Sequence, residues 1–258
     1  MRIFLSLLVT LSTATAAEGL TGLDVASEMI ARDTGYISYT SDVEMSITAA
    51  NGDSVHRELT IKGIEQEHDG DKIITYFQAP RDIAGTALLT FSHAIDADDQ
   101  WLYLPSIKRI KRISSNNRSG PFMGSEFAYE DMSSWELDKY RYELVKEKKQ
   151  DGRAYWLLAC FPRYENSGYS KLIAWIDQDI YQPRKIEYYD RKGILFKQLT
   201  NSQYELHNQH YWRPKFAQMD NLQSKRSSSL TWQNMTMGED VSQAQFEPKQ
   251  LRNAYRYH

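Results

Sequence analysis

The 258-residue sequence is poor in cysteine, in long apolar runs and in the signatures of common enzymes. Its one cysteine, Cys160, lies in an apolar, strand-like run and cannot form an internal disulfide, so we expect a buried and unreactive thiol. The sequence contains no G-x-S-x-G elbow, no P-loop and no dinucleotide fingerprint. We therefore expect no enzymatic activity, no catalytic residues and no cofactor.

Histidines and carboxylates are also not spaced as metal ligands. His207 and His210 are three residues apart in a segment whose composition is typical of strands and turns. In a strand, their side chains would point to opposite faces. The cluster of Asp96, Asp98 and Asp99 lacks the glycine and the final glutamate of a calcium loop. We expect no metal site. The net charge of −3 does not indicate a nucleic-acid or bulk membrane binder.

The amino terminus has the three parts of an export signal. Arg2 is a short basic region, residues 3–11 are apolar, and residues 12–17 are small, with cleavage expected after Ala16 or Ala17. The apolar run is about half of the roughly 20 residues that a membrane-spanning helix needs, which favours a signal peptide over an uncleaved anchor. We expect residues 1–17 to be removed and residues 18–258 to form a single domain, soluble in the periplasm.

Residues after the signal predict one helix followed by a mainly β fold. Leu23, Ala26, Met29 and Ile30 recur at helical spacing over residues 23–30, with Gly35 closing the helix. From there, short runs rich in Tyr, Ile, Val and Thr alternate with turn residues, which predicts roughly ten to twelve antiparallel strands. Strongly twisted sheets of this length tend to curl. We expect a curled sheet that forms an incomplete β-barrel, with its interior either filled or hollow.

One segment differs from ordinary strand and turn, because residues 100–125 contain no acidic residue. Four cations lie close together there, Lys108, Arg109, Lys111 and Arg112, and apolar and basic side chains are mixed on both faces of the run. Such a segment can be an edge strand protected against aggregation by its charges. It can also be a basic patch that contacts lipid headgroups or an acidic partner. Both interpretations are open at this point.

A polar stretch typical of a mobile loop, residues 114–120, leads into a cluster of aromatic and methionine side chains. Phe122, Met123, Phe127, Tyr129 and Met132 follow one another closely. A flap of this composition suits adaptable apolar binding. Alternatively, the same residues pack a short helix, over residues 129–135, onto the sheet.

At this segment the sequence resembles the LolA-like outer-membrane lipoprotein-sorting proteins, a periplasmic group often found with permeases of the RND type. The matching blocks are residues 85–89, 99–105, 112–115 and 122–132, with further likeness at residues 174–177 and 181–190. The resemblance covers most of the chain after the signal, and the block from Trp101 to Asp131 is the most specific part.

The resemblance implies an incomplete barrel whose short helices act as a lid over an apolar cavity that takes acyl chains. The residues expected to line the cavity or lid are Trp101, Tyr103, Phe122, Met123, Phe127 and Tyr129, and the four cations named above are expected to contact headgroups or a partner. The implied function is a monomeric carrier of lipid or lipoprotein acyl chains, with an RND-type permease as partner. A sensor or adaptor that regulates a membrane partner without releasing its cargo is the alternative.

Overall fold

The computed structural model describes residues 19–256, and the expected signal peptide, residues 1–17, lies outside them. The described chain forms one antiparallel sheet of thirteen strands, slightly more than the sequence pattern predicts. The strands are β1 (Ser38–Thr48), β2 (Ser54–Ile64), β3 (Lys72–Ala79), β4 (Ala87–Phe91), β5 (Asp99–Leu104), β6 (Arg109–Arg112), β7 (Tyr140–Gln150), β8 (Arg153–Pro162), β9 (Tyr169–Asp177), β10 (Pro183–Asp190), β11 (Leu195–His207), β12 (Tyr211–Asn221) and β13 (Ser227–Met237).

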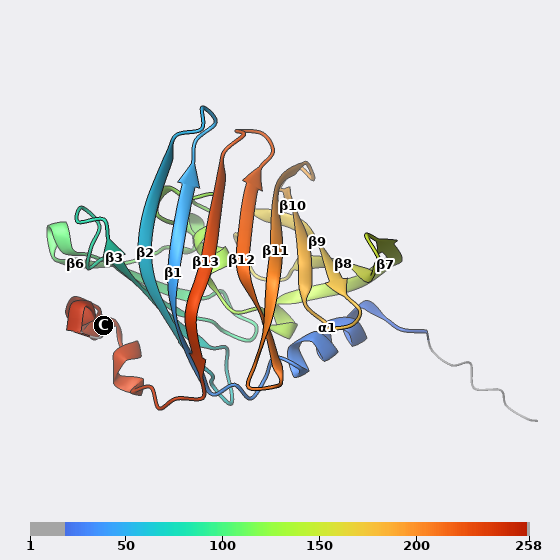
Figure 1. Cartoon of the computed structure of the whole chain (residues 1–258), viewed down its shortest axis with the longest axis horizontal. Helices are drawn as coiled ribbons and strands as arrows, with labels where there is room; N and C mark the ends of the chain where they lie inside the picture. Colours follow the sequence, from blue (N-terminus) through green and yellow to red (C-terminus); the bar gives the residue numbers. More distant parts are fainter. Residues whose placement is uncertain (1–18, 257–258) are drawn as a thin grey trace, which may run out of the picture.

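The order of the strands in space shows how the chain builds the sheet. It runs β6-β5-β4-β3-β2-β1-β13-β12-β11-β10-β9-β8-β7, so β6 and β7 form the two edges. The first six strands therefore step outward to one edge, and the last seven step back from the other edge until β13 pairs with β1. Figure 1 shows the resulting sheet bending backward at both sides. The expected curled, incomplete barrel is confirmed.

Hairpin turns lie where the sequence places them. Val43, Met45 and Ile47 are buried on one face of β1, and the turn through Gly52, which has a φ of 93°, leads into β2. Leu59 on β2 pairs opposite Val43 and is also buried, so both strands of this hairpin direct apolar side chains to the same face. Alternation with a period of two is the reason that these positions could be predicted from sequence.

The one α-helix among residues 19–256 is α1 (Gly22–Ala31), which packs on β7 and β8. Thr21 and Asp24 form a capping box that satisfies backbone amides at its start. Its buried face differs from the expected one, because Val25 is buried whereas Leu23 is about half exposed. The reason is the approach of the helix: a Cβ at Gly22 would lie 2.6 Å from the backbone nitrogen of Leu144, so the first turn rests directly on β7.

Helix α1 also ends earlier than the sequence suggests. Its last residue is Ala31 and Arg32 is the C-cap, so Gly35, with a φ of 95°, lies beyond the helix rather than closing it. Among residues 19–256 no helix combines the length and the apolar character that crossing a membrane would require.

Short 3-10 helices supply the remaining regular structure. They are η1 (Pro105–Ile107), η2 (Ser115–Asn117), η3 (Phe122–Gly124), η4 (Tyr129–Met132), η5 (Leu137–Lys139), η6 (Gln243–Phe246) and η7 (Pro248–Arg256). The helix expected over residues 129–135 is thus a single 3-10 turn that ends at Met132, and Ser133, its C-cap, is extended. The acidic and serine-rich composition of this stretch favours turns over a longer helix.

Apolar side chains form two cores, one on each face of the sheet. The larger core lies on the face that α1 and the β6–β7 connection cover, which we call the inner face; it includes Val43, Leu88 and Leu102. The smaller core lies on the outer face, where Leu89 packs with Phe246 and Leu251 of the carboxyl-terminal 3-10 helices. Neighbouring residues such as Leu88 and Leu89 belong to different cores because successive side chains of a strand point to opposite faces.

Candidate functional site

The connection between β6 and β7, residues 113–139, crosses the inner face of the sheet, and we call it the strap. Its ends are attached to the two opposite edge strands, so it has to span the whole sheet. Figure 1 shows this green segment behind the central strands. The strap is therefore the segment that closes the open side of the curled sheet.

Apolar side chains of the strap fill the inner core. Phe122 is fully buried, with its ring centroid 5.7 Å from that of Phe77 and 5.6 Å from that of Tyr129. Phe127 is 4% exposed, and Met123 and Tyr129 are partly buried against the same core. Four of the six residues that the sequence assigns to a ligand-contacting lid thus lie together on one face.

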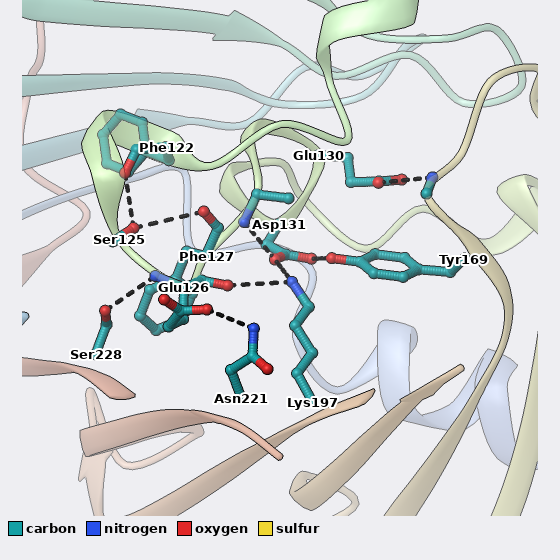
Figure 2. Close-up of polar contacts among 12 residues, drawn as sticks. Phe122, Ser125, Glu126, Phe127, Glu130, Asp131, Tyr169, Lys197, Asn221 and Ser228 are labelled. Atoms are coloured by element: carbon teal, nitrogen blue, oxygen red, sulfur yellow. Dashed lines mark hydrogen bonds and ion pairs between the residues drawn. The ribbon is translucent and has the colours of Figure 1, made fainter. Parts of the chain in front are cut away.

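A buried ion pair ties the middle of the strap to β11. Lys197 Nζ donates to Asp131 Oδ2 at 2.7 Å and to the Glu126 carbonyl at 3.3 Å, as Figure 2 shows, and the Lys197 and Asp131 side chains are 3% and 6% exposed. The Tyr169 hydroxyl donates to the other oxygen of Asp131 at 2.8 Å, and the ring of Tyr169 lies 4.8 Å from Lys197 Nζ. Removing one partner of such a pair costs about 3–5 kcal/mol, because the other charge stays buried and uncompensated.

The turn between Phe122 and Phe127 has its own polar contacts. Ser125 Oγ is buried and donates to the Phe122 carbonyl at 2.7 Å. The Glu126 amide donates to Ser228 Oγ on β13 at 2.9 Å, and Asn221 Nδ2 of β12 donates to the Glu126 carboxylate at 2.8 Å (Figure 2). These bonds fix the turn against the strands that lie in the centre of the sheet.

Glu130 attaches the strap to the loop before β9. Its carboxylate accepts hydrogen bonds from the Tyr164 hydroxyl at 3.1 Å, Ser167 Oγ at 2.9 Å and the Gly168 amide at 2.9 Å. Burial, together with the neighbouring Asp131 carboxylate, raises the pKa of Glu130 above its ordinary value. The strap is thus held by two neighbouring carboxylates, those of Glu130 and Asp131.

The carboxyl-terminal end of the strap is held by a second buried ion pair. Lys139 and Asp98 pair with side-chain exposures of 4% and 10%, which connects η5 to the segment before β5. The Trp135 indole nitrogen donates to the Tyr142 hydroxyl on β7 at 3.0 Å. Between this end and the Asp131 contacts lie Ser133 to Glu136, and their inner side borders a hollow.

This hollow is a cavity of about 400 Å³ beside the end of α1. Its walls come from α1 and the residues after it, the starts of β1 and β3, the strap at Ser133 to Glu136, and β10, β12 and β13. The volume falls within the range of about 300–1,000 Å³ that is usual for small-molecule pockets. The inner side of the sheet is therefore filled in part by strap side chains and is hollow in part.

Carboxylates give this cavity a negative charge, which is unusual for a pocket that binds acyl chains. Asp33, Glu65, Asp69, Asp71 and Glu136 line it. Burial raises the pKa of Asp33, Asp71 and Glu136, in each case as the largest effect. Burial also raises the pKa of the Tyr36 and Tyr39 hydroxyls, which keeps these side chains neutral.

Trp101 and Tyr103, the other two residues that the sequence assigns to the lid, are separated from the strap. They point to the outer face and pack in the smaller core, where the Trp101 ring centroid is 5.0 Å from that of Phe91. Their neighbour Leu102 belongs to the inner core. The sequence motif joins these residues in one block, but alternation along β5 divides them between the two faces.

Lys108, Arg109, Lys111 and Arg112 gather at one edge of the sheet. Lys108 precedes β6 in a left-handed conformation with a φ of 52°, and β6, which carries the other three, is an edge strand. All four are exposed, and Arg112 pairs with Asp99 on the neighbouring strand. This position agrees with a charged edge that resists strand pairing, and it leaves Lys108, Arg109 and Lys111 accessible.

Sequence reasoning did not identify the residues that hold the strap or line the cavity. Lys197 is separated from Asp131 by 66 positions, and Arg213 from Asp33 by 180. No local pattern marks such pairs. Cys160, in contrast, is buried as expected, and burial raises the pKa of its thiol.

Comparisons with known proteins agree with this architecture. A family model described as an uncharacterized protein matches residues 69–253, and no curated protein matches the chain. A crystal structure from Vibrio parahaemolyticus, described as an outer membrane lipoprotein-sorting protein domain, is 45% identical; the match covers 90% of this chain and 98% of that one, with a TM-score of 0.88.

Two further solved structures share the fold. A DUF1329 family protein from Desulfovibrio piger is 27% identical over 89% of this chain and 97% of its own, with a TM-score of 0.85. A LolA superfamily protein from Nitrosomonas europaea has a TM-score of 0.71 at 19% identity, over 89% of this chain and 98% of its own. With its curled sheet, its strap and these relatives, the chain belongs to the LolA-like family of outer-membrane lipoprotein-sorting proteins.

Proposed function

We propose that this protein is a periplasmic carrier that shields the acyl chains of a lipid or lipoprotein beneath the strap and passes them between membranes or to and from an RND-type permease. The observation that carries the proposal is the cavity of about 400 Å³ between the strap and the inner face of the sheet. The description of the 45% identical relative as a lipoprotein-sorting domain supports it. The expected export signal indicates the periplasm as the compartment in which the protein acts.

Hydrophobic burial is sufficient to bind such a ligand without chemical catalysis. Removing apolar surface from water contributes about 25 cal/mol per Å², and an acyl chain offers several hundred Å². We assign no catalytic residue. The strap side chains Phe122, Met123, Phe127 and Tyr129 do not line this cavity, but they pack in the inner core that also contains its lining residues Met29 and Ile73, and we propose them as contacts for the chain on that ground.

The placement of Trp101 and Tyr103 changes their proposed role. They lie on the outer face under the carboxyl-terminal segment, so an acyl chain beneath the strap would not reach them. The exposed cations Lys108, Arg109 and Lys111 are the proposed contacts for a headgroup or for the membrane partner, with Arg112 less available because it pairs with Asp99.

The direct test is mass spectrometry of lipid extracted from protein that is purified gently from periplasm. The proposal expects a reproducible acyl-containing ligand, which then moves to acceptor vesicles. Lipid that binds and changes affinity for a membrane partner without leaving would identify a sensor. Repeated preparations that carry no lipid and bind no acyl probe would overturn both.

A pair of variants locates the ligand on one face. Met123→Asp places a charge on the strap and is expected to weaken binding of a fluorescent fatty acid, whereas Trp101→Asp changes the outer face and is expected to leave that binding unchanged. Circular dichroism confirms that both variants are folded. Equal effects of the two substitutions would contradict the assignment to the inner face.

A further inference from the structure

The cavity beside α1 combines three properties that an ordinary acyl pocket does not need: negative charge, aromatic walls and an unsatisfied polar atom. It lies between the strap at Ser133 to Glu136 and the segment that follows α1. Its apolar lining includes Met29, Ile30 and Ile73, so one part of it can still accept a hydrocarbon body.

The negative charge is not balanced by cations in the wall. Arg213 is the one lysine or arginine among the described residues that line the cavity, and it pairs with Asp33. Asp71 and Glu136 form no ion pair among residues 19–256, and Lys139, whose charge acts on Glu136, is paired with Asp98. Two largely buried carboxylates without an ion-pair partner of their own are costly, and a bound cation would compensate them.

The contacts of these carboxylates keep them in place. Asp71 Oδ2 accepts hydrogen bonds from the Tyr36 hydroxyl at 2.7 Å and from Ser134 Oγ at 3.3 Å. Glu65 accepts bonds from two backbone amides, those of Gly35 at 2.7 Å and Ile37 at 2.6 Å. Uncharged hydrogen-bond donors thus hold these carboxylates in place and do not cancel their negative charge.

Aromatic rings and one unpaired hydroxyl complete the walls. Tyr36 and Tyr39 pack with ring centroids 5.7 Å apart on one side, and Trp135 and Trp232 line the cavity elsewhere. Cations are attracted to the faces of such rings, above all to Trp. Ser133 Oγ, which belongs to a lining residue, is buried and has no hydrogen-bond partner among the described residues. It is available to a ligand.

We propose that this cavity binds the cationic headgroup of an amphiphile, an ammonium group attached to an apolar body, between Asp71, Glu136 and the aromatic walls. The inference rests on the proposed carrier function and specifies its ligand class. The apolar body extends toward the strap core, and the ammonium group supplies the positive charge that the cavity lacks. Residues 19–256 hold no gathered set of metal-ligating side chains, which favours an organic cation over a metal ion.

Three probes with the same dodecyl chain test the charge preference: dodecyltrimethylammonium, dodecyl maltoside and dodecyl sulfate, each titrated below its micelle concentration into the delipidated full mature chain. Calorimetry and the fluorescence of the tryptophans report binding. The expected result is that the ammonium probe binds at least about tenfold more tightly than the sulfate probe, since a tenfold ratio requires about 1.4 kcal/mol.

The variant Asp71→Asn with Glu136→Gln removes two charges and keeps the side-chain shapes. It is expected to lose the ammonium preference by about tenfold or more while dodecyl maltoside binding is unchanged. The matched control is Glu44→Gln with Asp53→Asn, two exposed carboxylates on and beside β1, which carries the same change in net charge and should retain the preference. The single variant Glu136→Gln provides a second measurement if the double variant does not fold.

The outcomes separate this inference from the carrier function. Equal binding of all three probes, or a preference that both double variants retain, would overturn the cationic ligand and leave the acyl carrier standing. Binding of no probe by the folded, delipidated protein would overturn both.

Discussion

Two parts of the strap, residues 113–132 and residues 133–139, differ in what they contribute. In the first part, Phe122 and Phe127 are buried, and Asp131 is compensated by Lys197. In the second part, Ser133 Oγ is buried without a partner, and Glu136 borders a cavity with its pKa raised by burial. Arg118 Nε in the first part is also buried without a partner, so the two parts differ chiefly in charge: Asp131 has a partner cation, whereas Glu136 forms no ion pair among residues 19–256.

This difference indicates a division of roles within one connection. Groups whose hydrogen bonds and charges are satisfied contribute to stability, whereas unsatisfied buried groups reduce it and persist where a ligand makes use of them. The first part therefore anchors the strap on the sheet. The second part lines the cavity for which we propose a cationic ligand, and substitutions at the anchor and at the carboxylates of the cavity should have opposite effects on stability.

The largest effect is expected for Lys197→Met, which leaves Asp131 buried without its cation. We expect a loss of about 3–5 kcal/mol in the free energy of unfolding, measured by urea denaturation. Lys215→Met is the matched control, because Lys215 pairs with Glu205 at the surface and such pairs contribute about 0–1 kcal/mol. The double variant Lys197→Met with Asp131→Leu should recover much of the loss. Similar small losses for both lysines would show that the strap is not anchored there.

A smaller effect is expected for Ser125→Ala. The substitution removes the side-chain hydrogen bond to the Phe122 carbonyl inside the buried turn, and this carbonyl keeps the bond from the backbone amide of residue 125, so we expect a cost of about 0.5–1.5 kcal/mol. Thermal unfolding checks the loss, and hydrogen exchange of residues 122–127 should increase. Ser170→Ala, at an exposed serine on β9, serves as the comparison. An unchanged melting temperature for Ser125→Ala would argue against a fixed turn.

The smallest effect, and the one of opposite sign, is expected for Asp71→Asn. Burial raises the pKa of Asp71, and Tyr36, Ser134, the Gln66 amide and the Glu65 carboxylate face it. The folded protein therefore binds a proton at Asp71 more tightly than the unfolded chain, so this carboxylate contributes most stability at low pH and loses it as pH rises through its raised pKa. The variant should melt at a higher temperature than the wild type at neutral pH.

Comparing the two proteins across pH isolates the effect of that single group. The advantage of Asp71→Asn should shrink as the pH falls from neutral toward the ordinary pKa of a carboxyl group, because the wild-type carboxyl, whose pKa is raised, becomes neutral in the folded state. A lower melting temperature for the variant at neutral pH, or an advantage that does not depend on pH, would show that the hydrogen bonds of Asp71 outweigh the cost of its charge.

Local patterns were sufficient for most of the sheet. Val43, Met45 and Ile47 alternate in the sequence and lie buried on one face of β1, and the glycine turns connect strands as expected. Helix α1 was predicted as an element, but its buried face was not, because the choice between Leu23 and Val25 depends on how Gly22 meets the backbone of β7. Propensity sets the type of an element, and packing sets its orientation.

The candidate site was predictable only in part for the same reason. Phe122, Met123, Phe127 and Tyr129 are neighbours in sequence and remain neighbours in the strap. Trp101 belongs to the same sequence block and lies on the other face. The cavity could not be predicted, because its walls come from segments that the strand order brings together, such as the end of α1, the start of β3 and β12.

By itself, the sequence determined the mainly β class, the positions of the strands and the family, because these depend on periodicity and on motifs that are contiguous in the chain. The tertiary structure alone decided that β1 pairs with β13, that the strap must cross from one edge to the other, and that Lys197 meets Asp131. Such contacts join residues that are distant in sequence, and their energies arise only when the sheet has curled and water has left the space between them.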